Sequence, residues 1–191
     1  MSQTRSWTAR VFIATSLDGY IAHRDGDIRW LTEPTPDPDH IPPSRERAVD
    51  NFDQHMARVD RVVMGRKTYE KVLSLPGWQY GDTKVIVLSR TMRYGVHEHT
   101  HGVVEVINDL DDLRETFERE IVRRVYVDGG EVVQTFLQNG WVDEIILTTA
   151  PILLGRGIPL FGYLHTSIRL TLLGTDVIDN GMISCRYKVL N

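Results

Sequence analysis

Short runs of apolar, often β-branched residues alternate along this chain with segments whose apolar residues follow helical spacing. A short apolar run between turn residues is typical of a strand, and apolar positions three and four residues apart are typical of an amphipathic helix. The predicted strands are residues 9–15, 61–64, 84–88, 103–106, 123–127, 142–149, 168–174 and 182–190. The predicted helices are residues 44–57, 67–73, 110–120 and 131–138.

This alternation predicts an α/β fold with a mostly parallel, eight-stranded central sheet flanked by helices. The runs at 9–15, 61–64, 84–88 and 123–127 are almost continuously hydrophobic, as expected for strands that are covered on both faces. We therefore expect these four strands at the centre of the sheet. The turn signal Asn180-Gly181 between the last two strands predicts a C-terminal antiparallel hairpin.

Composition narrows the class of protein. The 191 residues are 41% hydrophobic and 25% charged, which predicts a single globular domain over residues 1–191. The formal net charge of -4 and the scattered arginines give no basic surface of the kind that binds nucleic acid. We therefore expect no nucleic-acid partner.

Cysteine usage and hydropathy bear on where the protein works. Cys185 is the only cysteine, so no intramolecular disulfide can form. We expect its side chain to be a small buried hydrophobe rather than a reactive thiol. No apolar run reaches 18 residues, and residues 1–10 lack the apolar core of a secretory signal. These features predict a cytoplasmic protein without a membrane partner.

The strongest candidate for a binding motif is the paired glycine at the end of the predicted strand 123–127. Gly129 and Gly130 follow Asp128 and lead directly into the helical segment that begins with Glu131 and Val132. Residues without a Cβ atom allow backbone N–H groups to approach a ligand, and the start of a helix favours an anion. The motif predicts a phosphate site, although a tight turn without a ligand would use the same residues.

Two further strand ends carry phosphate-binding chemistry. Gly65, Arg66, Lys67 and Thr68 repeat the order of strand, glycine and helix, and they add two cations and a hydroxyl group. A solvated helix start is the alternative interpretation. The strand at 84–88 ends in Ser89-Arg90. Because the carboxyl ends of parallel strands meet at one edge, the three ends together predict an elongated, multiply phosphorylated ligand such as a dinucleotide.

The usual dinucleotide fingerprint is absent from the sequence. No G-x-G-x-x-G follows a strand, and Gly155-Arg156-Gly157 precedes Ile158-Pro159, which cannot open a helix in the required way. This disfavours a standard Rossmann domain.

Four ordered motifs carry a family resemblance over nearly the whole chain. They are Ile13 to Ala22, Val63 to Tyr69, Val127 to Gly130 and Pro151 to Phe161. Their order resembles the dihydrofolate reductase-like superfamily, and more closely the C-terminal reductase domain of riboflavin biosynthesis (the RibD type) and its stand-alone relatives. The Ser-Leu-Asp-Gly at 16–19 and the last motif are typical of this second branch.

The resemblance implies a three-layer fold, NADPH as hydride donor and a homodimer. It also implies that the pyrophosphate lies near Gly129 and Gly130, with the adenosine 2′-phosphate near the cations at the other two strand ends. The expected cofactor-binding residues are Ala14, Asp18, Gly19, Ile21, Gly65, Arg66, Lys67, Thr68, Ser89, Arg90, Asp128, Gly129, Gly130, Glu131 and Val132.

Three residues are the candidates for the catalytic centre. Trp30 and Thr148 fall where related proteins enclose the nicotinamide, although Trp30 could instead anchor its loop without touching a ligand. Folate reductases place a carboxylate in the first helix to supply the proton. Here Val49 falls at that position and Asp50 lies beside it, so Asp50 is either the proton source or a surface carboxylate.

Three other segments invite a functional interpretation. His97, His99 and His101 alternate and could bind a metal if they lay in a strand, but we expect them in a polar loop and predict no metal site. The acidic residues within 109–120 interleave with apolar residues at helical spacing, so we expect a solvated helix face. The proline-rich segment 33–43 is long enough to be a lid.

The sequence thus predicts an NADPH-dependent oxidoreductase that acts on a small heteroaromatic, imine or carbonyl substrate of pteridine-like or pyrimidine-like type. One alternative is a true dihydrofolate reductase. The other is a protein that binds NADP(H) without turnover, which the missing helix carboxylate favours.

Overall fold

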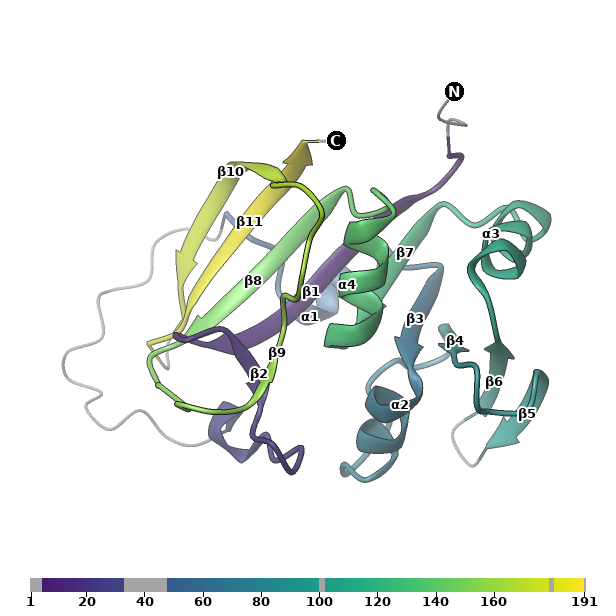
Figure 1. Ribbon diagram of the computed structural model, residues 1–191, viewed down its shortest axis with the longest axis horizontal. Helices are drawn as coiled ribbons and strands as arrows, with labels where there is room; N and C mark the ends of the chain where they lie inside the picture. Colours follow the sequence, from purple (N-terminus) through teal and green to yellow (C-terminus); the bar gives the residue numbers. More distant parts are fainter. Residues whose placement is uncertain (1–4, 33–47, 100–101, 179–180, 191) are drawn as a thin grey trace.

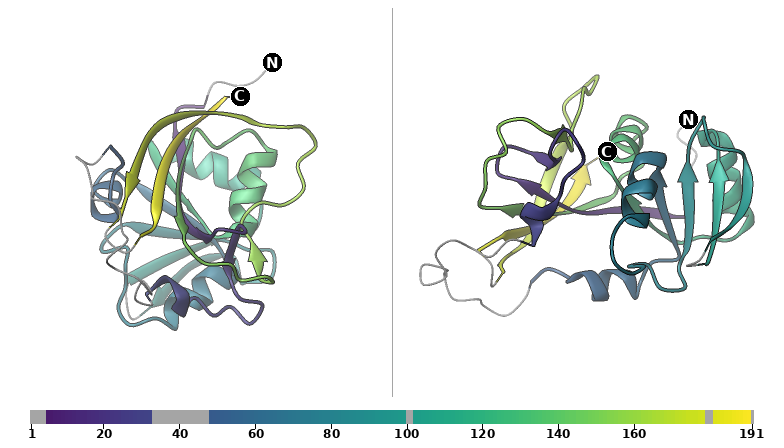
Figure 2. Two further views of the ribbon diagram at one scale, coloured as in Figure 1. Left: turned by 90° about the vertical axis from the view of Figure 1, so that its left-hand side faces the viewer. Right: turned by 90° about the horizontal axis from the view of Figure 1, so that it is seen from below.

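A twisted, mostly parallel sheet forms the centre of the molecule. The computed structural model describes residues 5–32, 48–99, 102–178 and 181–190, and within them nine strands form one sheet in the order β10-β11-β8-β1-β7-β3-β4-β6-β5 (Figure 1). The strands are β1 (Thr8–Ser16), β3 (Arg61–Gly65), β4 (Lys84–Leu88), β5 (Gly95–His99), β6 (Gly102–Ile107), β7 (Arg124–Asp128), β8 (Glu144–Ala150), β10 (Arg169–Val177) and β11 (Ile183–Leu190). The yellow C-terminal strands and the teal strands lie at opposite ends of the sheet (Figure 2).

Helices cover both faces of the sheet. The apolar sides of α3 (Leu110–Arg119) and α4 (Gly130–Gln138) pack on one face, where Phe117 and Phe136 are fully buried. On the other face, α2 (Arg66–Leu73) packs through Tyr69 and Val72, and α1 (Phe52–Met56) packs beside it. None of the helices in the described residues is long and apolar enough to cross a membrane.

The four almost continuous hydrophobic runs occupy the centre of the sheet, as predicted. β1, β7, β3 and β4 are neighbours and run parallel to one another. Their central residues, including Val62, Val63, Val87 and Val127, are completely inaccessible to solvent. The C-terminal hairpin is also confirmed, because β10 and β11 pair antiparallel; residues 179 and 180 of the predicted turn lie outside the described residues.

Three strands were missed. β5, at the sheet edge, contains His97, so the prediction of a loop there is wrong. Its alternation of polar residues around Val96 carries too little apolar content to stand out as a strand. β2 (Tyr20–Ala22) and β9 (Ile158–Pro159) pair in a separate two-stranded sheet, and each is too short to produce a period.

The first predicted helix is much shorter than expected. Residues 48–51 are not helical, and α1 begins only at Phe52, after Asn51 caps it by accepting a hydrogen bond from the backbone N–H of Gln54 at 2.8 Å. The residues before α1 are held in a non-helical conformation by Asp176 of β10. Its carboxylate accepts hydrogen bonds from the N–H groups of Ala48 and Val49 at 2.8 and 2.7 Å. Residues 33–47, which include the proline-rich segment, lie outside the described residues.

Candidate functional site

Two neighbouring strands lead into helices on opposite faces of the sheet, and we call the region at the starts of these two helices the crevice, after the switch-point crevice of open α/β sheets. β3 and β7 are adjacent and parallel, yet β3 leads into α2 on one face and β7 leads into α4 on the other. Ligands of open α/β sheets bind at such switch points, outside the carboxyl ends of the strands. The two glycine motifs of the sequence, at Gly65 and Gly129, stand on the two sides of this crevice.

Glycine is required at position 129 for two reasons. Its φ of +84° lies in the left-handed region, and a Cβ atom there would stand 2.0 Å from Oγ1 of Thr68 in α2. A Cβ atom on Gly65 would meet Val132 of α4 at 3.4 Å. The starts of α2 and α4 are therefore in direct contact, so the residues of two predicted phosphate sites lie side by side.

Both helix starts lack a side-chain cap. Neither Gly65 nor Gly129 caps its helix with a side chain, whereas Asn51 and Asp109 cap α1 and α3. The first N–H groups of a helix have no partner within it, and they carry its positive dipole end. The crevice thus presents two sets of N–H groups that can donate hydrogen bonds to an anion.

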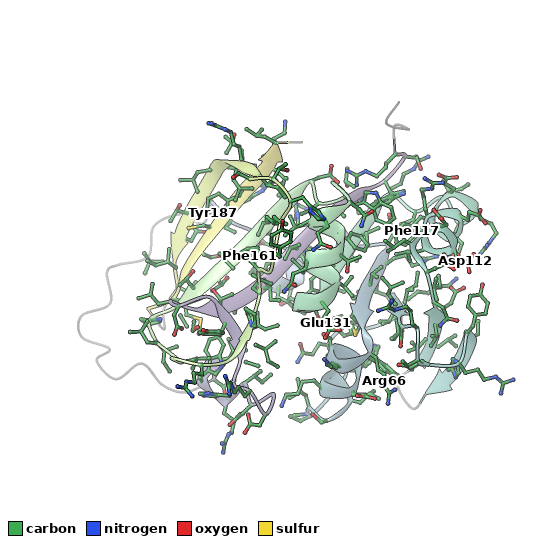
Figure 3. All side chains as sticks on the ribbon, in the orientation of Figure 1. Arg66, Asp112, Phe117, Glu131, Phe161 and Tyr187 are labelled. Atoms are coloured by element: carbon green, nitrogen blue, oxygen red, sulfur yellow. The ribbon has the colours of Figure 1, made fainter. Side chains whose placement is uncertain are left out.

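Two cations stand at the start of α2, and both are paired with carboxylates. Arg66 pairs with Glu70 of its own helix (Nε–Oε1 2.6 Å), and its Nη1 also donates to Thr91 at 3.3 Å. Lys67 pairs with Glu131 of α4 (Nζ–Oε1 2.7 Å), and this carboxylate raises the pKa of Lys67. Figure 3 labels Arg66 and Glu131 at the neighbouring ends of the two helices.

The end of β4 approaches the same cations. The buried hydroxyl of Ser89 accepts hydrogen bonds from the backbone N–H groups of Thr91 and Met92, at 3.3 and 3.2 Å. Arg90 is exposed beside it. The contact between Arg66 and Thr91 brings the predicted 2′-phosphate residues of α2 and β4 together, with Ser89 shaping the turn.

Asp128 fixes a neighbouring loop. Its carboxylate accepts a hydrogen bond from the hydroxyl of Tyr80 at 2.8 Å. Burial raises the pKa of Asp128, although the hydrogen bonds from Tyr80 and from the backbone of Gly129 oppose this. Asp128 thus lies at the end of β7, and its hydrogen bond with Tyr80 gives it a structural role.

The connection after β1 forms another wall of the crevice. Asp18 accepts the N–H groups of Leu154 and Gly155, at 3.1 and 2.7 Å, and the hydroxyl of Ser16 lowers the pKa of the Asp18 carboxyl. The oxygen of Gly19 accepts the N–H of Leu160. Ile21 approaches Gly130 so closely that a Cβ there would lie 3.3 Å from its Cδ1. Ile21 and the loop at 154–160 thus stand next to the start of α4.

A cavity of about 290 Å³ opens on the face that carries α1. One row of residues crosses four strands in register: Ala14 lies opposite Thr148, Thr148 opposite Ser184, and Ser184 opposite Asp176. All four line the cavity, together with aromatic and aliphatic side chains that include Phe12 and Phe52. Two predicted residues, Ala14 and Thr148, are therefore brought together, and the hydroxyl of Thr148 donates to Ser184 at 3.1 Å.

Asp50 also lines this cavity, but it is not on a helix. Its Oδ2 atom pairs with Arg10 at 2.9 Å and with Arg58 at 3.1 Å. The Asp50 carboxylate is half-buried rather than solvated on a helix surface. To act as a proton source, Asp50 would have to be protonated, and protonation would weaken its ion pairs with Arg10 and Arg58.

Trp30 anchors its loop. It lies in a short 3-10 helix (Arg29–Leu31) and is only 5% exposed, in a cluster with Ala150 and Met182. Its Nε1 atom is buried without a hydrogen-bond partner in the part of the chain described here. Ile178 packs on the same cluster and lines the cavity, so Trp30 lies behind one cavity wall.

Ser184 and Asp176 are cavity residues that the sequence did not single out. They belong to the C-terminal hairpin, and only its register against β8 places them beside Thr148. Ser184 shares its face of β11 with Arg186 and Lys188, so no local pattern marks it as a cavity residue. Among the described residues, no group of three or more His, Cys, Asp or Glu side chains is arranged to hold a metal ion.

The fold is that of dihydrofolate reductases. Dihydrofolate reductase from Enterococcus faecalis, in complex with NADP(H) and RAB-propyl, superposes with a TM-score of 0.61 at 14% identity, over 98% of this chain and 99% of that one. The family model of the RibD C-terminal domain matches residues 8–184. The chain belongs to this family.

Relatives of similar length support the assignment. A structure from Shewanella sp. PV-4, named for riboflavin biosynthesis, has a TM-score of 0.79 at 35% identity and covers 96% of this chain and 99% of its own. The Bacillus subtilis (strain 168) protein YwjB is 35% identical over 169 residues, which are 86% of this chain and 88% of YwjB. RibD from Acinetobacter baumannii is longer, and the match covers 58% of it at 18% identity.

Proposed function

We propose that this protein is an NADPH-dependent reductase that transfers a hydride to a small heteroaromatic, imine or carbonyl substrate of pteridine-like or pyrimidine-like type. The observation that carries the proposal is the crevice between β3 and β7, where two helices begin without side-chain caps and two cations stand in the first turn of α2. Membership of a reductase-like family supports the same conclusion.

The residues of the crevice fit the phosphates of NADPH. The backbone N–H groups of Gly130, Glu131 and Val132 would hold the pyrophosphate, since the start of α4 offers them without a competing cap. Arg66, together with Lys67, Ser89 and Arg90, would hold the 2′-phosphate, because Arg66 already reaches the turn after β4. When bound, NADPH supplies the hydride.

The cavity lined by Ala14 and Thr148 would hold the substrate. Its aromatic and aliphatic side chains suit a flat ring, and they exclude water from the reacting carbon. Asp50 lies in the same cavity and is the proposed partner for the proton of the substrate. Because Asp50 is paired with Arg10 and Arg58, it would act through the network of these groups rather than as an isolated acid.

The direct test is a fluorescence titration with NADPH and NADH, followed by turnover with a panel of pteridines and pyrimidines that includes dihydrofolate. We expect NADPH to bind more tightly than NADH and one panel member other than dihydrofolate to be reduced. Reduction of dihydrofolate would favour a true folate reductase. Tight binding without any turnover would favour a non-catalytic NADP(H)-binding protein, which the pairing of Asp50 with two arginines also favours.

We also propose that two copies of the chain associate through β10. This strand forms an edge of the sheet, and Leu170, Leu172 and Leu173 on it are 43%, 56% and 48% exposed. Apolar residues on an unpaired edge favour association with another chain. Sedimentation of the wild type should give a dimer and Leu172→Asp a monomer, and a monomeric wild type would contradict the proposal.

A further inference from the structure

The ion pair between Lys67 and Glu131 joins the two helix starts of the crevice. Each residue is the second of its helix, and the pair is formed by side chains that are 80% and 69% exposed. An exposed ion pair of this kind contributes little stability, since water and salt screen it. It can therefore open at small cost.

Glu131 places a negative charge where the proposed function requires the charge of a ligand. An acidic residue in the first turn interacts favourably with the positive end of the helix. The carboxylate of Glu131 also neutralises Lys67, the cation of the facing helix. A phosphate group bound between α2 and α4 would seek the same N–H groups and the same cation, and it would be repelled by Glu131.

We propose that the Lys67–Glu131 pair is a displaceable latch across the phosphate site, in which Glu131 competes with the ligand for Lys67. The proposal rests on the proposed function, because it assumes that a nucleotide pyrophosphate lies between α2 and α4. The latch lowers the affinity of the site for any phosphate group held there, because Lys67 must part from Glu131 before it can pair with the ligand.

The second ion pair of α2 provides a matched control. Arg66 and Glu70 are also exposed, at 49% and 54%, but both belong to one helix, four residues apart. Glu70 stands in the second turn, away from the start of α4. Neutralising Glu70 removes the same charge as neutralising Glu131 without opening the contact between the helices.

The test measures binding of inorganic pyrophosphate and of NADP⁺ by calorimetry at low salt. Glu131→Gln should tighten both by about 3- to 10-fold. Glu70→Gln should change the binding of pyrophosphate by less than about 2-fold, because pyrophosphate lacks the 2′-phosphate proposed for Arg66 and Glu70 stands away from the start of α4. Lys67→Met should weaken binding more in the Glu131→Gln background than in the wild type, since only there is Lys67 free of its competitor. Glu131→Ala is the second variant and should match Glu131→Gln.

Unchanged or weaker binding of pyrophosphate to both Glu131 variants would overturn the latch. Equal effects of Lys67→Met in the two backgrounds would overturn it as well. If the wild type binds neither NADPH nor NADP⁺, the proposed function fails, while the comparison of pyrophosphate binding between the wild type and Glu131→Gln still decides the latch. Circular dichroism of each variant establishes that the compared proteins are folded.

Discussion

Helices α2 and α3 follow parallel strands at the same edge of the sheet, yet their first turns are opposite in chemistry. Asp109 caps α3 by accepting the N–H of Asp112 at 2.9 Å, and Asp111 and Asp112 place acids in its first turn. The start of α2 has no side-chain cap, and its first turn carries Arg66 and Lys67. The positive end of the α3 dipole is therefore balanced by the helix's own acidic residues. The positive end of the α2 dipole has no such acidic residue in the first turn and favours a bound anion.

The difference separates residues that stabilise the fold from residues that bind. Substitutions of residues that cap a helix, such as Asp109, should change the free energy of unfolding without changing cofactor affinity. Substitutions of the α2 cations should do the reverse. Gly129 is the position where both effects should meet, because it holds the backbone of the crevice.

The largest effect is expected for Gly129→Ala. The positive φ and the overlap with Thr68 should together lower the free energy of unfolding by about 3 kcal/mol and should also weaken NADPH binding. Gly140→Ala is the control, because Gly140 has a φ of +63° with open space around it. Urea denaturation measures the free energy of unfolding of both variants, and fluorescence titration measures their affinity for NADPH. Equal stability of the two variants would show that the contact between α2 and α4 is not tight.

A pH effect of similar size is expected from His55, which is buried against Phe12. Burial, with a smaller contribution from Arg10, lowers the pKa of His55 to about 4, against an opposing effect of Asp50. Between pH 6.5 and about 4 the unfolded chain binds a proton that the folded chain does not, so stability falls as the pH is lowered, by up to about 3 kcal/mol.

The variant His55→Phe isolates this contribution. Urea denaturation across this pH range should show a flatter pH dependence for the variant than for the wild type, with unchanged NADPH affinity at pH 7. Identical slopes in the two proteins would mean that folding does not lower the pKa of His55. A loss of cofactor affinity would move His55 from the stabilising residues to the binding residues.

Arg66→Ala should weaken NADPH binding by about 10- to 150-fold, which corresponds to a charge-assisted contact of about 1.5 to 3 kcal/mol. NADH binding should be unchanged, because NADH lacks the 2′-phosphate. The unfolding free energy should stay within about 0.5 kcal/mol, since the pair with Glu70 is exposed. Arg119→Ala on α3 is the control. An equal loss of affinity for NADPH and NADH would show that Arg66 does not bind the 2′-phosphate.

The smallest effect is expected for Asp109→Ala, at the other helix of the comparison. Loss of the cap on α3 should lower the free energy of unfolding by about 1 kcal/mol. Cofactor affinity should not change, because α3 starts outside the crevice between β3 and β7. A change in NADPH affinity, measured by the same titration, would mean that the two helix starts are not independent.

The central fold could be predicted because burial on both faces leaves a clear record in the sequence. β1, β3, β4 and β7 are almost continuous apolar runs, and that pattern correctly predicted their place at the centre of the sheet. The edge strand β5 pairs with the next strand along the chain, β6, but it carries too few apolar residues to stand out. The short β2 and β9 pair with each other although they are distant in sequence, so no local period reveals them. The first helix is short because Asp176 holds Ala48 and Val49, which is a tertiary contact.

The crevice could be predicted better than the cavity. Glycines at strand ends and cations in a first turn are local signals, and the structure brings these residues together as the sequence predicts. The cavity depends on strand register, which places Ser184 beside Thr148 across 36 residues. The assignment of Asp50 and Trp30 as catalytic stays a prediction; their neighbours show the competing tasks of ion pairing and loop anchoring.

A crystal structure with NADP⁺ at saturating concentration tests the central claim most directly. The account predicts the pyrophosphate against the backbone N–H groups of residues 130–132, between α2 and α4, with the 2′-phosphate beside Arg66. An empty crevice, or NADP⁺ bound elsewhere on the molecule, would contradict it.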